Sequence, residues 1–283
     1  MLVSGTELFA AAKKGGYAVG AFNLNNMEIL QAIIEAAEEV KSPVFIQASQ
    51  GALKYAGIEY IAGLAKTAAK KAKIPIALNL DHGTSFEQAA QCVYHGFSAL
   101  MIDGSRLPFE ENIAITQKVV EIARPNNISV EAELGKIGGT EDDITVAEHE
   151  ATYTDPDEAK EFVDRTNVDA LAVAIGTAHG VYKGEPKLDL ERLAAINEAL
   201  DLPLVMHGAS GVPDDAIRKS IPLGICKINI DTELRQAFSE AIHKVLAENP
   251  AEIDPRKILG PAREAMKEVA KTKMRLFGSA NKA

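Results

Sequence analysis

The chain has 283 residues, with 30 Lys and Arg against 40 Asp and Glu, which gives a formal charge of −10. This charge argues against a nucleic-acid partner, which favours clustered basic residues, and no segment reaches the roughly 18 apolar residues that a membrane span needs. The first residues lack a basic segment followed by an apolar one, so we expect no signal peptide. The two cysteines, Cys92 and Cys226, are expected to be buried thiols in a reducing cytoplasm.

Short apolar runs typical of buried strands alternate with amphipathic helical stretches along the whole chain. The spacing of Leu30, Ile33 and Ile34 predicts a helix over 27–39. Further helix starts are indicated by a capping box at 85–88 and by Asp155 followed by Pro156. The predicted strands cover residues 18–22, 44–48, 76–80, 98–102, 129–133, 170–175, 202–206 and 225–230.

Eight strand-then-helix units predict a (β/α)8 TIM barrel with extra C-terminal helices. An open doubly wound sheet is the alternative, but no Gly-x-Gly-x-x-Gly follows the first strand. Since one barrel commonly takes about 250 residues, we expect residues 1–283 to form a single domain. The connection over 135–154 is long and polar, and we expect it to be a mobile loop over the functional site.

Functional side chains of such barrels lie at the C-terminal ends of the strands. Three histidines, each followed by glycine, end the third, sixth and seventh predicted units: His82, His179 and His207. Brought together, they form the three-ligand arrangement of a catalytic zinc site, whereas a structural site is closed by four ligands. Imidazole ligands also suit cobalt, iron or nickel. Structural roles are expected for the remaining histidines: His95, His149 and His243.

Carboxylates fall at the ends of the third, fourth and fifth predicted strands. Asp81 directly precedes His82, so it either accepts a hydrogen bond from a ligating histidine or acts as a general acid and base. Asp103 and Glu133 end the fourth and fifth strands. They either hold a second or alternative metal position or orient the ligands of the first.

Small and polar residues follow strands seven and eight, where barrels often bind phosphate. Their backbone N–H groups and the start of the next helix attract an anion, although tight turns alone are an alternative explanation. Asp231 would repel a phosphate, so it must point away, pair with Arg235 or share the site with a monovalent cation. The residues concerned are Gly208, Ala209 and Ser210, with Gly211 beside them, and Asn229, Ile230, Asp231 and Thr232.

Together these features resemble the class II, metal-dependent fructose-bisphosphate aldolases, a group that includes tagatose-bisphosphate aldolases. The resemblance runs the whole length of the chain. Its most specific segments are Leu80-Asp81-His82-Gly83, Glu131-Ala132-Glu133-Leu134-Gly135, Gly138-Gly139-Thr140-Glu141-Asp142-Asp143 and Lys227-Ile228-Asn229-Ile230-Asp231-Thr232.

The resemblance implies a role for each site residue. The catalytic zinc is expected on His82, His179 and His207, with Asp103 and Glu133 as ligands of an alternative or second metal position. Asp81 is expected to be the proton donor, and Glu141 the base for the dihydroxyacetone phosphate carbon. Substrate contacts are expected from Asn23, Ser49 (at the glyceraldehyde 3-phosphate end), Gly180, Lys183, Gly208, Ala209, Ser210, Asn229, Ile230, Asp231, Thr232 and Arg235.

The implied reaction is reversible cleavage of fructose 1,6-bisphosphate at C3–C4, with an enediolate stabilised by zinc. Tagatose bisphosphate, which differs at C4, is the alternative; the segments 254–257 and 273–279 resemble the glycolytic branch and favour fructose. Two rivals are a Schiff-base aldolase using Lys227, which is more simply a buried ion pair with Glu131, and a non-catalytic sugar-phosphate sensor. We expect a homo-oligomer, either a dimer or a tetramer.

Overall fold

The computed structural model describes residues 2–141, 144–182 and 184–283. Eight parallel strands close into a barrel in the order β1-β11-β10-β8-β5-β4-β3-β2. Each overlaps one predicted strand, so the predicted TIM barrel is confirmed. The strands are β1 (Val19–Asn23), β2 (Val44–Ser49), β3 (Ile76–Gly83), β4 (Ala99–Ile102), β5 (Ser129–Leu134), β8 (Ala170–Val173), β10 (Leu204–Met206) and β11 (Ile225–Ile230).

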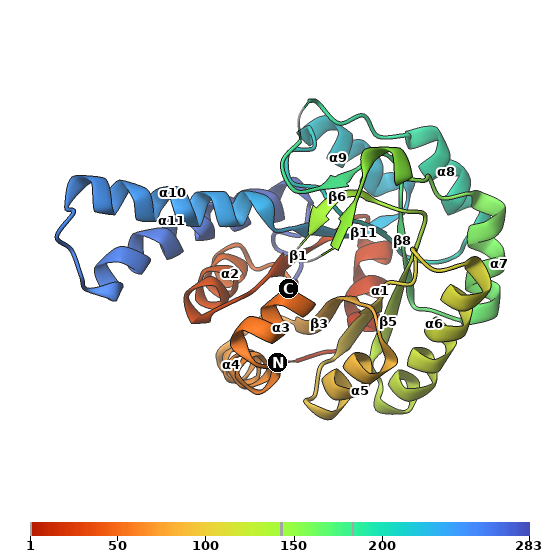
Figure 1. Ribbon diagram of the computed structural model, residues 1–283, viewed down its shortest axis with the longest axis horizontal. Helices are drawn as coiled ribbons and strands as arrows, with labels where there is room; N and C mark the ends of the chain where they lie inside the picture. The colour runs from red at the N-terminus through yellow and green to blue at the C-terminus, as the bar shows by residue number, and fades with distance from the viewer. Residues whose placement is uncertain (1, 142–143, 183) are drawn as a thin grey trace.

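Helices surround the barrel (Figure 1). Both predicted helix starts are confirmed: Ser85 accepts a hydrogen bond from the Gln88 N–H, and Asp155 caps the helix that begins at Pro156. The reciprocal bond of the predicted capping box is not formed, because Gln88 Oε1 has no hydrogen-bond partner among the described residues. The helices are α1 (Gly5–Gly15), α2 (Met27–Val40), α3 (Gln50–Ala56), α4 (Ile58–Lys71), α5 (Phe86–Tyr94), α6 (Phe109–Ala123), α7 (Pro156–Thr166), α8 (Leu190–Ala199), α9 (Asp214–Ser220), α10 (Thr232–Glu248) and α11 (Pro255–Leu276). In the described part of the chain, none is both long and apolar enough to cross a bilayer.

The N-terminal end of the barrel is sealed by apolar packing. Leu8 and Phe9 of α1 are buried with Phe45 and other inward-facing strand residues in one cluster. A second and larger cluster fills the space between the strands and the outer helices. Because the sealed end is apolar, the polar side chains of the interior gather toward the C-terminal ends of the strands, as expected for the functional end of this fold.

The long connection over 135–154 is not the loop that the sequence predicts. It contains an antiparallel pair, β6 (Gly138–Glu141) and β7 (Ile144–Val146), and β6 also pairs with β9 (Ala178–His179). Gly139 makes this pairing possible: its φ is +98°, and a Cβ there would lie 2.1 Å from the His179 carbonyl oxygen. The connection therefore holds a hairpin beside a predicted metal ligand; its mobility remains a prediction.

The last two helices form a hairpin that extends away from the barrel (Figure 1). The base of α11 is tied to α2 by polar contacts: Arg263 donates to Gln31 (2.9 Å), and Lys271 pairs with Glu39 (2.6 Å). These are the extra C-terminal helices of the prediction.

Candidate metal centre and substrate pocket

The three strand-end histidines meet at one point. His82 ends β3, His179 lies in β9 and His207 follows β10. Their candidate ligand nitrogens lie within 4.8 Å of one another. His82 Nε2 and His207 Nδ1 are 2.9 Å apart, and both side chains are buried. In contrast, His95 caps the end of α5, and His149 and His243 are exposed; none of these joins a candidate metal group of the described residues.

Carboxylates orient two of these imidazoles. His82 Nδ1 lies 2.9 Å from Asp103 Oδ2, and His207 Nε2 lies 2.8 Å from Glu131 Oε1. An ionised carboxylate only accepts, so each neutral imidazole carries its proton on the carboxylate side. The opposite nitrogens then present lone pairs to each other across 2.9 Å. A cation at that position relieves the repulsion. Carboxylates that accept a hydrogen bond from the far nitrogen of a ligating histidine are typical of metal sites, so these residues fit zinc.

His207 is held as a neutral imidazole, which is the form that binds a metal. Burial, opposed by the neighbouring Glu131, lowers the pKa of His207 to about 4, so the ring is neutral at pH 7. Burial alone would raise the pKa of Asp103, but hydrogen bonds with His82 and Ser105 hold it well below its usual value. Neutral imidazole and ionised carboxylate are the protonation states that a metal centre requires.

A second group of ligand atoms lies on the other side of His82. His82, Asp103 and Glu133 also bring their candidate ligand atoms within 4.8 Å of one another. Glu133 Oε2 is buried with no hydrogen-bond partner among the described residues, 3.9 Å from His82 Nδ1. Burial and the adjacent charge of Asp103 raise the pKa of Glu133 well above its usual value. A second cation bound here would give Glu133 Oε2 a partner and would stabilise the ionised form of the carboxyl group.

Asp81 is fully buried and accepts two amide hydrogen bonds. Asn23 donates to Oδ2 at 2.8 Å, and Asn229 donates to Oδ1 at 3.3 Å. Behind Asn23, Gln47 donates to its oxygen (2.7 Å), and Asn79 donates to Gln47 (3.4 Å). The sequence analysis missed Gln47 and Asn79, although each lies two residues before a predicted site residue on the same face of its strand, which was the available signal.

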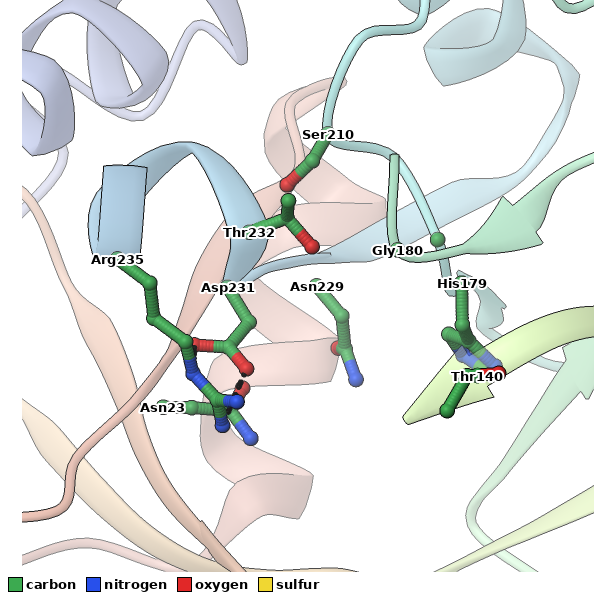
Figure 2. Close-up of a pocket in the computed structure, with 10 residues that line it drawn as sticks. Asn23, Thr140, His179, Gly180, Ser210, Asn229, Asp231, Thr232 and Arg235 are labelled. Atoms are coloured by element: carbon green, nitrogen blue, oxygen red, sulfur yellow. Dashed lines mark hydrogen bonds and ion pairs between the residues drawn. The ribbon is translucent and has the colours of Figure 1, made fainter. Parts of the chain in front are cut away.

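A pocket opens beside the histidines (Figure 2). Arg235, Asp231 and Asn23 lie on one side of it, and His179 and Thr140 on the opposite side. Thr140, from the β6–β7 hairpin, was not predicted. The pocket is lined by Asn23, Thr140, His179, Gly180, Gly208, Ser210, Asn229, Asp231, Thr232 and Arg235.

Three of the predicted substrate residues that the structure describes do not line this pocket: Ser49, Ala209 and Ile230. The Ala209 and Ile230 side chains lie in the apolar cluster outside the barrel strands, so only their backbone can face a ligand. Ser49 is buried and caps α3 by accepting from the Ala52 N–H. Lys183 lies outside the described residues, as does the side chain of Glu141.

Asp231 pairs with Arg235, one of the three arrangements that the sequence left open. Arg235 Nη2 lies 2.7 Å from Asp231 Oδ2, and Nε donates to Oδ1 at 2.9 Å. Helix α10 begins at Thr232, beside this pair, so its first N–H groups and positive dipole end are at the pocket. Ser210 and Thr232 both line the pocket here (Figure 2), and Ser210 Oγ accepts from the Glu233 N–H of the first turn of α10 at 3.4 Å.

Tyr182 joins the two loops that carry His179 and His207. Its hydroxyl accepts from the Ala178 N–H at 2.7 Å and donates to the Gly208 carbonyl at 2.8 Å. The loops are in close backbone contact there, because a Cβ on Gly208, where φ is +60°, would lie 2.5 Å from the Ala178 oxygen. Tyr182 was not predicted from the sequence.

The predicted ion pair inside the barrel is confirmed. Lys227 Nζ lies 2.7 Å from Glu131 Oε2, and both side chains are buried. Burial alone would raise the pKa of Glu131, but Lys227 and His207 lower it to about 2. With its ammonium buried and paired, Lys227 is poorly placed to attack a substrate carbonyl.

A closed barrel with clustered histidines, a buried carboxyl group and a polar pocket at a helix N-terminus defines a metal-dependent barrel enzyme. Residues 3–282 match the family model described as fructose-bisphosphate aldolase class-II. A probable fructose-bisphosphate aldolase of Bacillus subtilis (strain 168) is 51% identical over 285 residues, covering 100% of this chain and 99% of that protein. The fructose-bisphosphate aldolase of Thermus caldophilus is 47% identical over 306 residues, with both chains fully covered.

Solved structures agree. The crystal structure of the YdjI aldolase from Escherichia coli K12 matches with a TM-score of 0.89 and 41% identity, covering 100% of both chains. The chain therefore belongs to the class II fructose-bisphosphate aldolase family. It is an aldolase, a lyase that cleaves a carbon–carbon bond, and its family is zinc-dependent and acts on sugar phosphates.

Proposed function

We propose that this enzyme reversibly cleaves fructose 1,6-bisphosphate into dihydroxyacetone phosphate and glyceraldehyde 3-phosphate, with zinc on His82, His179 and His207. The observation that carries the proposal is the convergence of the three imidazoles, two of them oriented by carboxylates, next to the buried carboxyl of Asp81. The names of the two relatives described above support this choice of sugar.

Bound zinc supplies a Lewis acid that polarises the substrate carbonyl and stabilises the charge left by C–C cleavage. The protein's own part is proton transfer and positioning. In cleavage, Asp81 takes the proton of the C4 hydroxyl, and in condensation it returns that proton to the aldehyde oxygen. Asn23 and Asn229 donate to its two oxygens and hold the carboxylate in place for this transfer.

Glu141 is proposed as the base for the carbon-bound proton of dihydroxyacetone phosphate. Its backbone ends β6, next to Thr140 of the pocket wall and one strand away from His179. A carboxylate from the hairpin would reach the pocket from the side of Thr140, opposite Arg235 and the start of α10.

Phosphate binding is proposed at the start of α10, where backbone N–H groups and the Ser210 and Thr232 hydroxyls gather. Arg235 adds the positive charge that an acidic protein needs there, while Asp231 holds it in position. Lys183 is proposed as a further phosphate contact and Ser49 as a contact for the aldehyde half. Asp103 and Glu133 are proposed to hold a second or alternative divalent metal position, and a monovalent cation is proposed near the substrate phosphate.

We also propose that residues 1–283 act as one barrel domain in the cytoplasm, consistent with two buried, unpaired cysteines. A homo-oligomer, either a dimer or a tetramer, is proposed because the α10–α11 hairpin stands away from the barrel and Leu234 is the one buried residue of α10. Sedimentation that gives only the 30.2 kDa monomer would contradict this assembly.

Turnover of both sugars by metal-loaded and chelator-treated protein tests the function. We expect chelation to abolish cleavage of fructose 1,6-bisphosphate, zinc or cobalt to restore it, and tagatose 1,6-bisphosphate to be the poorer substrate. Full activity in protein shown to be metal-free by elemental analysis would disprove the metal requirement. Preference for tagatose bisphosphate would show that the enzyme is a tagatose-bisphosphate aldolase.

A further inference from the structure

The proposed reaction does not use Lys227, although this lysine is fully buried in the middle of the barrel. It is the first member of a series of contacts that ends at the metal centre. Lys227 Nζ lies 2.7 Å from Glu131 Oε2, Glu131 Oε1 lies 2.8 Å from His207 Nε2, and His207 Nδ1 lies 2.9 Å from His82 Nε2. The four residues come from or follow four different strands, so only the closed barrel brings them together.

The direction of each hydrogen bond follows from the groups involved. An ammonium group has donors only, so Glu131 must accept from Lys227 at Oε2. A carboxylate paired with a cation accepts at its second oxygen as well, so His207 must donate from Nε2. A neutral imidazole has a single ring proton, and the proton on Nε2 leaves Nδ1 as a lone pair. That lone pair faces His82 and the proposed metal position.

Asn229 packs against the same ring and links it to Asp81. Its Nδ2 lies 3.3 Å from Asp81 Oδ1, and this contact orients the amide, because the alternative orientation would place oxygen against oxygen. The same Nδ2 lies 3.1 Å from His207 Nδ1. It also lies 3.4 Å from His207 Nε2, so the amide lies over the face of the ring and leaves the Nδ1 lone pair directed at His82. The tautomer is therefore determined by the Glu131 contact at Nε2.

We propose that Lys227 and Glu131 are positioning residues that hold His207 in the Nε2–H tautomer, with Nδ1 directed at the metal. This inference rests on the proposed role of His207 as a zinc ligand. Stability alone is a poor reason for such a pair, because replacing a buried ion pair with apolar residues of similar volume is often neutral or stabilising. Partners that orient a metal ligand typically contribute 10- to 100-fold to metal affinity.

Two methionine substitutions separate metal binding from folding. Lys227→Met and Glu131→Met each remove one member of the pair, and the double variant replaces it with two apolar side chains. We expect zinc affinity, measured by competition with a chelating dye, to fall about 10- to 100-fold in each single variant. Because Lys227 acts through Glu131, adding Lys227→Met to Glu131→Met should have little further effect on zinc affinity. The metal-free double variant should unfold at a urea concentration close to that of the wild type.

Lys273→Met is the matched control. Lys273 is also a buried lysine paired with a glutamate, 2.7 Å from Glu233 Oε2, but the pair does not touch the histidines. We expect its zinc affinity to match the wild type. A double methionine variant of Lys227 and Glu131 that binds zinc as tightly as the wild type would overturn the proposal. That result would mean that the ion pair serves the fold and does not orient His207 for the metal.

The wild-type protein provides a test that does not depend on how any variant folds. In chelated protein with ¹⁵N-labelled histidine, the imidazole nitrogen shifts distinguish a protonated from an unprotonated nitrogen. The proposal requires His207 to be protonated at Nε2 and not at Nδ1; a proton on Nδ1 would refute it. If the wild type binds no zinc at the three histidines, the proposed function fails first. If it does, and the Lys227 variants bind equally well, only this inference fails.

Discussion

At the scale of single residues, the metal centre depends on which nitrogen of each ring faces inward. His82 even occupies the left-handed backbone region, with φ of +46°, which is unusual for a residue other than glycine. Such local strain is tolerated where surrounding contacts hold it, and it is common at functional sites. The Asp103 contact at Nδ1 holds this ring with Nε2 toward His207.

The histidines should separate into two groups on substitution. We expect His179→Ala and His207→Ala to lose both bound zinc and activity, because each removes one of three ligands. His95→Ala and His243→Ala should keep both, since these residues lie on outer helices away from the cluster. Metal analysis and turnover of the four purified variants check this, and a normal zinc content in His207→Ala would show that the ligand set is wrong.

Asp81 and Glu141 should separate in two assays, because they are assigned different protons. Asp81→Ala should reduce cleavage turnover by about 10²- to 10⁴-fold with the metal retained. Glu141→Ala should instead slow deuterium exchange into dihydroxyacetone phosphate in the absence of aldehyde. If Asp81→Ala abolishes this exchange while Glu141→Ala leaves it normal, the two roles are reversed.

At the scale of elements, the β6–β7 hairpin is coupled to the metal centre. Its strand β6 pairs with β9 in the register Gly139↔His179, so the hairpin backbone and a proposed ligand are hydrogen-bonded neighbours. Tyr182 then ties the same β9 segment to the loop after β10. A displacement of the hairpin is therefore transmitted to His179 by direct backbone contact.

Gly139→Ala tests this coupling. A Cβ at this position would lie 2.1 Å from the His179 oxygen, at a φ of +98°, so the two strands must separate. We expect turnover to fall by on the order of 10²-fold, because displacement of a catalytic group by about 1 Å has that effect. Steady-state kinetics measure the change.

Gly63→Ala is the control for that substitution. Gly63 is exposed inside α4, and no described atom beyond its chain neighbours and the adjacent helix backbone lies within 4 Å of the added Cβ. This variant should keep full turnover and gain about 0.5–1 kcal/mol in free energy of unfolding, since alanine is favoured over glycine within helices. Equal activity of the two variants would argue that the hairpin does not position His179.

At the scale of the whole molecule, a protein of formal charge −10 must bind an anionic sugar phosphate. The pocket meets this need locally with the N-terminus of α10, Arg235 and the proposed zinc. The acidic groups of the metal centre also lower the stability of the metal-free fold. Glu133 is buried without a hydrogen bond to Oε2 from the described residues, and its pKa is raised by burial and by Asp103.

Glu133→Gln should therefore stabilise the metal-free protein at neutral pH. A raised pKa in the folded state means that folding becomes less favourable as pH rises above 4.5, the usual pKa of this group. Glutamine does not titrate, so the variant should gain on the order of 1–3 kcal/mol at pH 7.5 and lose that advantage below about pH 4.5. Urea unfolding of chelated protein at the two pH values measures the difference.

Glu121→Gln serves as the control, because Glu121 is exposed on α6. Its unfolding free energy should change little relative to the wild type at either pH. A Glu133→Gln variant that is less stable than the wild type at pH 7.5 would contradict the expected cost of the buried carboxyl group.

The sequence by itself determined the eight strands, their helices and the three strand-end histidines. These follow from local patterns: apolar runs, capping residues such as Ser85 and Asp155, and polar residues where strands end. The barrel geometry then makes the strand ends converge, so Asp81, Asp103 and the pocket residues were predictable as members of one site.

Only the tertiary structure decided how these residues are oriented and what supports them. The pairing of residues 138–139 with 178–179, the amide series behind Asp81 and the Tyr182 contacts join segments that no local pattern relates. Lys227 and Glu131, 96 positions apart, show why. Sequence periodicity indicates that both face the interior, but the hydrogen-bond direction that orients His207 exists only once the barrel closes and brings the donor, the acceptor and the ring into contact.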